Sequence, residues 1–294
     1  MPIIDAHTHY YPAEVFNSPR EWALSRGETH WADCVAPANA PSIQGWADIE
    51  TFLRDMDAAD IEKAVLLGWY WQNPATCDEQ NRWYTEAARQ HPDRFLAFAS
   101  INATYTGPAI DTIRAARENG FCGIGEIHPQ VQGHTLRDDC WQKVMEAAIE
   151  TNLPINLHVT EPVGRDYPTK TETPLEDYVW LAGQYPEAQL ILAHWGGLLP
   201  FYEQNPAVAK QLANVYYDTA ASPLLYDKSI FRRVLDTIGP GRLLYGSDYP
   251  LRLYPRTQKS ADFLPFLQEI ASANLTQAET EALLHRNTDH ILAP

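Results

Sequence analysis

The first apolar segment of the chain ends in a His-x-His pair formed by His7 and His9. Side chains at positions i and i+2 of a β-strand point to the same face, so both imidazoles can converge on one point. Imidazole is a common ligand of zinc-class metals, and two rings on a rigid strand supply half of a metal site. Such a pair is also compatible with ordinary surface or core histidines, so its meaning depends on where the other ionisable residues fall.

Five further apolar segments also end in ionisable residues, which in chain order are Glu126 with His128, His158, His194, Asp218 and Asp248. Such side chains are costly to bury unless they are paired or bound to a metal. Their number therefore favours one shared metal site. The predicted ligands are His7, His9, Glu126, His158, His194 and Asp248.

Some of these residues keep a second interpretation. His194 precedes Trp-Gly-Gly and fits either a ligand or a catalytic residue beside the metal. Glu126 could instead neutralise a nearby histidine, and His128, on the same face, is predicted to contact substrate. Asp218 fits a helix cap as well as a functional group. The histidines in predicted loops or helices are expected at the surface: His30, His91, His134, His285 and His290.

Alternating strand-like and helix-like segments must position these residues. The expected strands span residues 3–6, 63–67, 94–100, 122–127, 155–159, 190–194, 215–218 and 243–247. The expected helices span residues 48–59, 78–90, 108–118, 138–150, 175–184 and 228–238, with two or three more after residue 258. This alternation favours an α/β fold, a (β/α)8 TIM barrel that forms a single domain over residues 1–294. In that barrel class the carboxyl ends of the strands form the active-site face.

The connection after the first strand runs from Tyr10 to about Gly45 without clear periodicity. It holds several aromatic side chains, which a disordered linker seldom carries. The segment is therefore either an ordered flap over the barrel mouth or a packing or oligomer contact. Trp69, after the second strand, adds an aromatic group on the same face and is a predicted substrate contact.

Four cationic residues lie on loops predicted to ring the mouth: Arg165, Lys170, Arg252 and Arg256. In an acidic chain such cations can recognise a carboxylate, and ordinary solvated charge is the alternative. Arg252 is the predicted substrate contact among them. Together with the aromatic residues, they predict a small-molecule substrate that bears a carboxylate.

Composition excludes several function classes. A formal net charge of −16 argues against a nucleic-acid partner, because phosphate binding needs cations. No run of apolar residues is long enough for a membrane span. The four cysteines are dispersed and the N-terminus lacks a signal-peptide pattern, so we expect reduced thiols in a cytoplasmic protein. The aromatic residues are compatible with a homodimer.

The chain resembles the amidohydrolase superfamily in its His-x-His pair, the histidines that end strands five and six, and the aspartate that ends strand eight. The opening Ile-Ile-Asp-Ala-His-Thr-His, the His-Trp-Gly-Gly, the Gly-Ser-Asp-Tyr-Pro and the terminal Arg-Asn-Thr-Asp-His-Ile-Leu resemble its amidohydrolase-related branch. That branch includes small-molecule hydrolases and non-oxidative decarboxylases. The resemblance spans residues 3–292 and implies one or two divalent ions, zinc foremost, with manganese as the alternative.

One position departs from many superfamily members, which place a carboxylated lysine on the fourth strand. Glu126 stands there instead, as in TatD-type hydrolases, which use a glutamate bridge. With such a bridge the resemblance implies one metal on His7, His9, Glu126 and Asp248 and a second on Glu126, His158 and His194. Without it, the resemblance implies a single metal on His7, His9, His158 and Asp248, with His194 beside it.

The ligand set predicts a metal-dependent hydrolase of a small-molecule ester, lactone or amide. A zinc-class ion lowers the pKa of a bound water to about 7 and polarises a carbonyl. Asp248 is the predicted general base, and His194 could stabilise the oxyanion or assist proton transfer. Two alternatives stay open. One is a metal-dependent non-oxidative decarboxylase (a lyase) of an aromatic or unsaturated carboxylic acid, and the other is a non-catalytic metal- or ligand-binding barrel.

Overall fold

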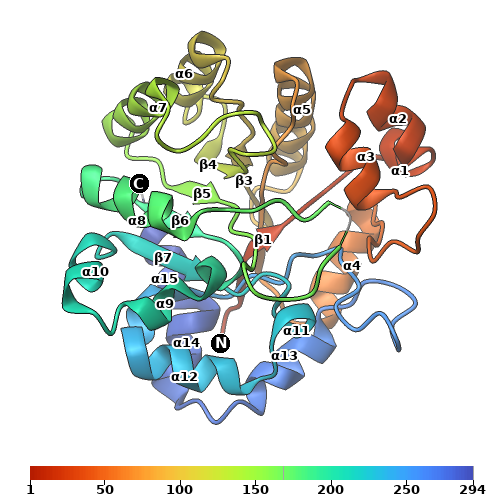
Figure 1. The fold of residues 1–294 in the computed structure, drawn as a ribbon. Coiled ribbons are helices and arrows are strands. Elements are labelled where there is room, and N and C mark those ends of the chain that lie inside the picture. The colour runs from red at the N-terminus through yellow and green to blue at the C-terminus, as the bar shows by residue number, and fades with distance from the viewer. Residues whose placement is uncertain (168, 294) are drawn as a thin grey trace.

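The computed structural model describes residues 1–167 and 169–293. Eight parallel strands follow one another in sequence order around a single sheet (Figure 1). They are β1 (Ile4–Thr8), β2 (Lys63–Leu66), β3 (Phe95–Ala99), β4 (Phe121–Ile127), β5 (Ile155–Leu157), β6 (Leu190–Leu192), β7 (Val215–Asp218) and β8 (Leu243–Leu244). Helices alternate with these strands, so the predicted (β/α)8 barrel is confirmed.

Hydrogen bonds between β1 and the segment that follows β8 close the barrel. The backbone amide of Ala6 donates to the Tyr245 carbonyl at 2.7 Å, and that of His9 donates to the Tyr249 carbonyl at 2.7 Å. A parallel bridge joins Thr8 to Tyr249 between these two bonds. Because all strands run in the same direction, their carboxyl ends meet at one end of the barrel.

The longer helices surround the barrel. They are α4 (Ile49–Ala58), α5 (Pro74–Gln90), α6 (Thr106–Ala115), α7 (Asp139–Glu150), α8 (Leu175–Gln184), α12 (Ser229–Ile238) and α13 (Leu264–Ala271). In α12 the buried residues are Ile230, Phe231, Val234 and Leu235, which share one helical face. Each helix predicted between strands is present, and α5 begins earlier than expected because Pro74 is well suited to a first turn. Within the described ranges, no helix combines the length and the apolar character needed to cross a membrane.

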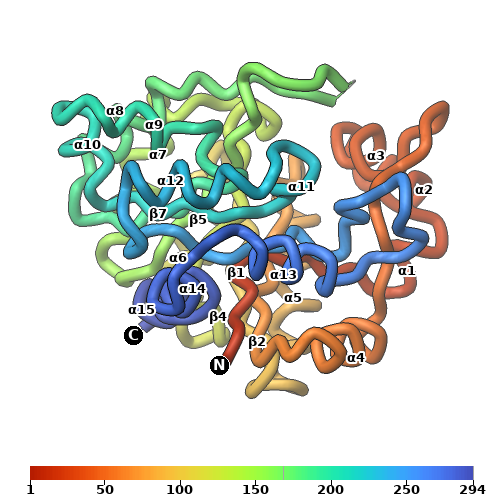
Figure 2. The backbone as a smooth tube through the Cα atoms, turned by 90° about the horizontal axis from the view of Figure 1, so that it is seen from below, coloured from red at the N-terminus to blue at the C-terminus, as the bar shows by residue number. Residues whose placement is uncertain are grey.

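Shorter helices occupy the second half of the chain. They are α9 (Leu199–Tyr202), α10 (Pro206–Gln211), α11 (Ser222–Leu225), α14 (Gln277–Glu281), a π-helical turn (Ala282–Arg286) and α15 (Asn287–Leu292). Ile291 of α15 packs into the apolar cluster inside the barrel, with Ala6 and Leu244. Figure 2 shows α14 and α15 beside the start of β1, so the chain end covers the amino-terminal end of the barrel.

β6 and β8 end earlier than expected, at Leu192 and Leu244. The residues predicted to close these strands lie beyond them in a backbone region that a strand cannot use. His194 has a φ of 55° and Asp248 a φ of 66°. Both predicted ligands therefore stand on turns that follow the strands.

Residues 13–35, which we call the flap, form three short helices where the sequence showed no clear periodicity. These are α1 (Ala13–Phe16), α2 (Pro19–Ser25) and α3 (Thr29–Val35), gathered at one side of the barrel in Figure 1. Their aromatic residues Trp22 and Trp31 pack with Trp69 and Trp71 into a second apolar core. The flap is thus an ordered unit, and its tryptophans serve packing.

Polar contacts fasten the flap to the start of α5. The Glu28 carboxylate accepts hydrogen bonds from the backbone amides of Gln72 and Asn73, at 2.8 and 3.0 Å. A negative charge at this position is favourable because the N-terminus of a helix carries a partial positive charge. Arg26 pairs with Glu79 on α5 through two hydrogen bonds of 2.7 and 2.9 Å.

Candidate metal centre

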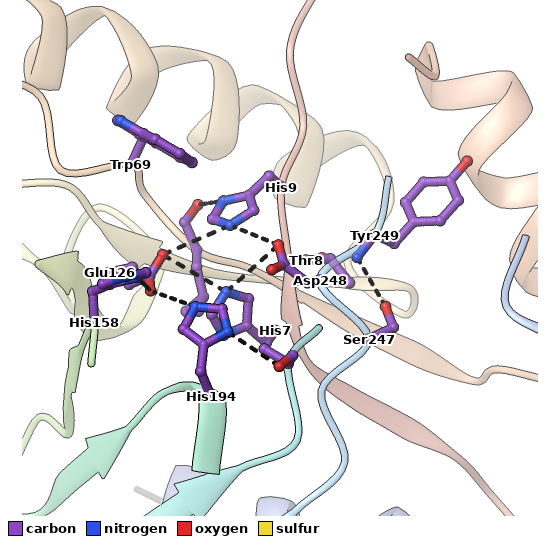
Figure 3. A network of polar contacts seen from close by, with 12 residues as sticks. His7, Thr8, His9, Trp69, Glu126, His158, His194, Ser247, Asp248 and Tyr249 are labelled. Carbon is purple, nitrogen blue, oxygen red and sulfur yellow. Dashed lines mark hydrogen bonds and ion pairs between the residues drawn. The ribbon is translucent and has the colours of Figure 1, made fainter. Parts of the chain in front are cut away.

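Five of the six predicted ligands converge at the carboxyl end of the barrel (Figure 3). They form two overlapping groups, His7 with His9 and Asp248, and His7 with Glu126 and His194. In each group the atoms that could hold a metal lie within 4.8 Å of one another. Four different strands or strand ends supply these residues, so the site exists only in the folded barrel.

The first group is centred on Asp248. Its Oδ1 lies 3.5 Å from Nε2 of His9 and 4.0 Å from Nε2 of His7. The backbone amide of Asp248 donates to the His7 carbonyl at 2.8 Å, which ties the turn after β8 to β1. The Asp248 side chain is 9% exposed and that of His7 is fully buried.

The second group is centred on Glu126, whose two oxygens face different histidines. Oε2 lies 3.7 Å from Nε2 of His7 and 3.8 Å from Nε2 of His9. Oε1 lies 3.4 Å from Nε2 of His194. The carboxylate therefore spans the space between the two groups.

Hydrogen bonds at Nδ1 fix the orientation of three imidazoles. Nδ1 of His7 faces Asp218 Oδ2 at 2.9 Å, that of His9 faces the Leu67 carbonyl at 3.0 Å, and that of His194 faces the Ala220 carbonyl at 3.1 Å. Each partner is an acceptor, so each ring holds a proton on Nδ1. With a metal bound, the Nε2 lone pairs would point into the site, as in metal-binding histidines that donate their other N–H to a carboxylate or carbonyl.

His158 reaches the same carboxylate in a different orientation. Its Nδ1 lies 2.7 Å from Oε1 of Glu126, at hydrogen-bond distance. It is the one predicted ligand outside both groups of possible metal-binding atoms formed by the described residues. In this geometry His158 positions Glu126, and its role as a ligand stays a prediction.

The buried charges make the site attractive to a cation. Burial alone would lower the pKa of His7, but the charges of Asp218 and Glu126 raise it to about 10. Burial would raise the pKa of Glu126, yet the charges of His158 and His7 hold it well below its usual range. Burial lowers the pKa of His9, so that ring is neutral and available as a ligand.

Asp218 is a residue whose part in the site the sequence left undecided. It is fully buried and, besides His7 Nδ1, accepts hydrogen bonds from the backbone amides of His194 and Ala220, both at 3.0 Å, and from Nδ2 of Asn156 at 3.2 Å. It is not the N-cap of α11, because that position belongs to Ala221. The sequence offered one signal for this role: Asp218 ends a strand, and a carboxylate buried there needs hydrogen-bond donors.

The turn that carries His194 has an unusual backbone. His194, Trp195, Gly196, Gly197 and Leu198 all have φ between 55° and 68°. L-residues adopt left-handed conformations as single residues rather than in runs, at a cost of about 1–2 kcal/mol each. The two glycines avoid that cost, while His194, Trp195 and Leu198 do not. Such strain persists at functional sites, where the surrounding structure imposes it.

The donor set fits a divalent ion. Nε2 of His7 is buried and has no hydrogen-bond partner in the part of the chain that the structure describes. A buried polar atom without a partner is costly, and metal coordination would satisfy it. Imidazole nitrogens with carboxylate oxygens suit zinc, and also manganese. The fit supports the expectation of a divalent metal.

Aromatic side chains cover the flap side of the site. Trp69, a predicted substrate contact, lies edge-on to His9 with ring centroids 5.6 Å apart, and it stacks on Tyr70 at 4.2 Å. His128, the other predicted contact at this side, is buried and stacks on His158 at 4.6 Å. His30 was expected at the surface, but its ring lies 6.5 Å from that of His128. The flap therefore delivers a polar group to the site that the sequence did not reveal.

The four cationic residues predicted to ring the barrel mouth have different surroundings in the structure. Arg252 donates to the backbone carbonyl of Ser42, which ties the segment after β8 to the connection before α4. Arg165 and Arg256 are exposed, and Lys170 is half-buried. The predicted contact of Arg252 with substrate stays a prediction. His134, a second histidine expected at the surface, is buried and accepts a hydrogen bond from Nε1 of Trp141.

A sequence model of the family described as Amidohydrolase matches residues 4–292. The chain belongs to the amidohydrolase family. L-fucono-1,5-lactonase from Burkholderia ambifaria is 23% identical over 264 residues, which cover 84% of this chain and 80% of that protein. The resemblance to the superfamily seen in the sequence is thereby confirmed.

Solved structures with the same fold include decarboxylases. 5-Carboxyvanillate decarboxylase from Novosphingobium aromaticivorans, complexed with manganese and 4-hydroxy-3-methoxy-5-nitrobenzoic acid, has a TM-score of 0.74 at 17% identity, covering 99% of this chain and 96% of that one. 2,6-Dihydroxybenzoate decarboxylase from Rhizobium has a TM-score of 0.68 at 15% identity, covering 99% and 98%. Family membership and these relatives support a metal-dependent enzyme. Both reaction classes left open by the sequence occur among the relatives.

Proposed function

We propose that this amidohydrolase-family protein is a metal-dependent hydrolase that opens a small-molecule lactone, with Asp248 as its general base. The ligands would be His7, His9, Glu126, His194 and Asp248. A divalent ion held by them would supply Lewis acidity, which polarises the lactone carbonyl and acidifies a water molecule.

The position of Glu126 carries the proposal. Its two oxygens face His7 and His9 on one side, at 3.7 and 3.8 Å, and His194 on the other, at 3.4 Å. A carboxylate in that position can join two ions, an arrangement used in hydrolytic sites. A decarboxylase with one ion has no evident use for such a bridge.

Asp248 is suited to move the proton. It lies beside two ligands, and its side chain retains 9% exposure while His7 is fully buried, so it faces the open end of the barrel. The left-handed backbone and the bond from its amide to the His7 carbonyl hold it there. Asp248 accepts the proton of the attacking water and returns it to the ring oxygen that leaves.

His194 acts as a ligand in this proposal. Its Nδ1 proton is engaged by the Ala220 carbonyl, so Nε2 is the nitrogen that would bind the metal. Burial would lower the pKa of His194, but the hydrogen bond and charge of Glu126 raise it, so metal binding would displace a proton from Nε2. The sequence-based alternative, in which His194 donates to the oxyanion, needs a proton on Nε2. Trp69 and His128 then lie on the flap side, where the substrate ring would stand.

Decarboxylation is the second candidate, and the structural neighbours favour it. The fold matches include decarboxylases that cover 99% of this chain, one of them complexed with manganese and a nitrobenzoic acid. The lactonase relative favours hydrolysis and covers 84% of the chain. A screen with lactones, aryl esters and hydroxybenzoates separates the two, because only decarboxylation releases carbon dioxide.

Metal content per chain tests the bridge. We expect two equivalents in the wild-type protein and about one in Glu126→Gln, measured by elemental analysis after reconstitution with zinc or manganese. Glu172→Gln, at an exposed glutamate in the loop after β5, is the matched control and should keep the wild-type content. One metal equivalent per chain in the wild type, unchanged in Glu126→Gln, would show that Glu126 does not bridge two ions. That result would favour the decarboxylase. Failure to bind either metal would overturn both enzymatic readings.

A further inference from the structure

A short segment between the flap and α4 pairs with the chain that follows β8. This segment, residues 42–45, which we call the strap, runs antiparallel to residues 250–252 through a bridge between Gln44 and Leu251. Two backbone hydrogen bonds of 2.9 Å flank the bridge, from the amide of Gly45 to the Pro250 carbonyl and from the amide of Arg252 to the Ile43 carbonyl. The strap therefore fixes the backbone just beyond Asp248.

The paired segment continues directly from the turn that carries Asp248. The backbone amide of Leu251 donates to the Asp248 carbonyl at 2.9 Å, which closes the turn. On the barrel side, the amide of Asp248 donates to the His7 carbonyl at 2.8 Å. Asp248 has a φ of 66°, in the left-handed region that is unfavourable for residues with a side chain, so the surrounding contacts must impose it. β1 holds the turn from one side and the strap holds it from the other.

The strap approaches its partner so closely that position 45 must be a glycine. A Cβ at Gly45 would overlap the carbonyl oxygen of Pro250 and would lie 3.1 Å from Cβ of Ala261. Both neighbours are fixed, one as backbone and the other as the first side-chain carbon. A larger residue at position 45 would therefore push the strap and the Pro250 carbonyl apart and weaken the hydrogen bond between them.

The side chain of Arg252 adds a further bond between the two segments. Its guanidinium donates to the backbone carbonyl of Ser42. The Ser42 hydroxyl in turn donates to the Val35 carbonyl at 2.6 Å and accepts from the backbone amide of Gln44 at 2.9 Å. Arg252 thus ties its own segment to a strap residue that further bonds keep in place.

We propose that the strap positions Asp248, with Gly45 and Arg252 as its positioning residues. The inference rests on the proposed function, in which Asp248 is a metal ligand and the general base. Both residues act through residues 250–252, and the turn keeps Oδ1 of Asp248 3.5 Å from Nε2 of His9. A shift of the turn would misplace this oxygen and weaken both metal binding and proton transfer. The substrate contact predicted for Arg252 from the sequence is the competing role.

Zinc affinity tests the strap without any substrate. In Arg252→Met and in Gly45→Ala we expect zinc to bind about 10-fold more weakly in competition with a chromogenic chelator, as after loss of other orienting groups. Arg252→Lys should restore most of the affinity, since its ammonium can also donate to a carbonyl. If Gly45→Ala fails to fold, the two substitutions of Arg252 still decide the test.

A double substitution shows whether Arg252 acts through Asp248. In an Asp248→Asn background, Arg252→Met should lower zinc affinity less than about twofold, because the carboxylate that it positions is already lost. A residue that only stabilises the fold would show the same loss in both backgrounds. The matched controls are Arg233→Met, at an exposed position on α12, and Gly241→Ala, where the described residues leave room for a Cβ.

Two matched lactones separate positioning from substrate contact. They are δ-valerolactone and the same ring with a carboxylate on the carbon next to the ring oxygen, both assayed with zinc in excess. We expect Arg252→Met to lower kcat about 10-fold for both lactones, with KM changed less than about twofold. A rise in KM for the charged lactone alone would make Arg252 a substrate contact and overturn its positioning role.

The zinc and lactone measurements can fail independently. Unchanged zinc affinity in Arg252→Met, or an equal loss in the Asp248→Asn background, would overturn the strap and leave lactone hydrolysis standing. If neither lactone reacts but zinc affinity changes as expected, the proposed reaction is wrong and the strap stands.

Discussion

The carboxyl end of the barrel and the flap bury their side chains by opposite means. At the barrel end, buried polar groups such as His7 and Asp218 are held by directional hydrogen bonds. In the flap, Trp22 and Trp31 are buried against Trp71, with ring centroids between 5.5 and 5.7 Å apart. Two buried indole hydrogen bonds interrupt the apolar character of this cluster: Trp31 Nε1 donates to the Tyr11 hydroxyl at 3.3 Å, and Trp71 Nε1 donates to Oε1 of Gln80 at 2.7 Å.

This difference assigns the chemistry to the barrel end and a share of the folding stability to the flap. Polar groups at the barrel end pay a desolvation cost that only cation binding and hydrogen bonding can offset. The flap gains free energy from apolar area, which any well-packed aromatic group can supply. Substitutions at the barrel end should therefore change catalysis and metal affinity, while those in the flap core should change stability.

The largest effect is expected for Asp248→Asn. Loss of the general base should lower kcat for a lactone substrate by about 100- to 10,000-fold, with little change in the melting temperature. Asp289→Asn, at an exposed position on α15, is the control for a lost carboxylate. Retention of more than half of the wild-type kcat in Asp248→Asn would refute the assigned role.

Trp31→Ala should have the largest effect on stability. Trp31 is 1% exposed, and its removal leaves a cavity in the flap core. We expect a loss of about 3–5 kcal/mol in the free energy of unfolding, measured by urea denaturation. Metal content of the folded fraction should stay at the wild-type value, since the ligands belong to the barrel. A parallel loss of metal would show that the two regions are coupled.

Asp218→Asn tests a residue that orients the proposed ligand His7 and is not itself a proposed ligand. The amide cannot accept from Nδ1 of His7, from Asn156 and from two backbone amides as a carboxylate does. Loss of such an orienting partner typically costs about 10- to 100-fold in metal affinity. Competition with a chromogenic chelator measures this affinity. An unchanged value would mean that Asp218 only stabilises the barrel.

The smallest expected effect is the release of a proton when the metal binds. In the metal-free protein His7 has a pKa raised to about 10, so it carries a proton at neutral pH, whereas a ligand needs a free lone pair on Nε2. Metal binding below pH ~10 should therefore expel at least the proton of His7, and apparent affinity should rise at least about tenfold per pH unit toward that value. Calorimetry in buffers of different ionisation enthalpy measures the proton count. Binding without proton release would show that His7 is not a ligand.

Most of the barrel could be predicted from local patterns. The strand over 215–218 and the helix over 175–184 match the expectations, because their apolar periodicity and their flanking residues agree. The flap helices escaped prediction because each is seven residues or shorter and lacks a full amphipathic repeat. They are stabilised by aromatic packing and by the Glu28 carboxylate, which accepts a hydrogen bond from the backbone just before α5. These contacts join residues that are distant in sequence.

In the candidate site, too, some features could be predicted from local patterns and others depend on long-range contacts. His7 and His9 could be paired from their spacing, because a strand places alternate residues on one face. Asp218 and His30 could not be assigned, since their partners lie 211 and 139 residues away along the chain. The orientation of His158 toward Glu126 also depends on the register of β4 and β5.

The sequence by itself determined the barrel, the family and the ionisable residues at or just beyond the ends of its strands, because these follow from apolar periodicity and from residue types at short spacing. The tertiary structure alone decided which ring nitrogens point inward, because these orientations rest on Nδ1 bonds to Asp218 and to the backbone carbonyls of Leu67 and Ala220. It also decided that the flap brings the ring of His30 within 6.5 Å of that of His128. Directional bonds and long-range packing have no local signature in a chain, so they emerge only when the barrel closes.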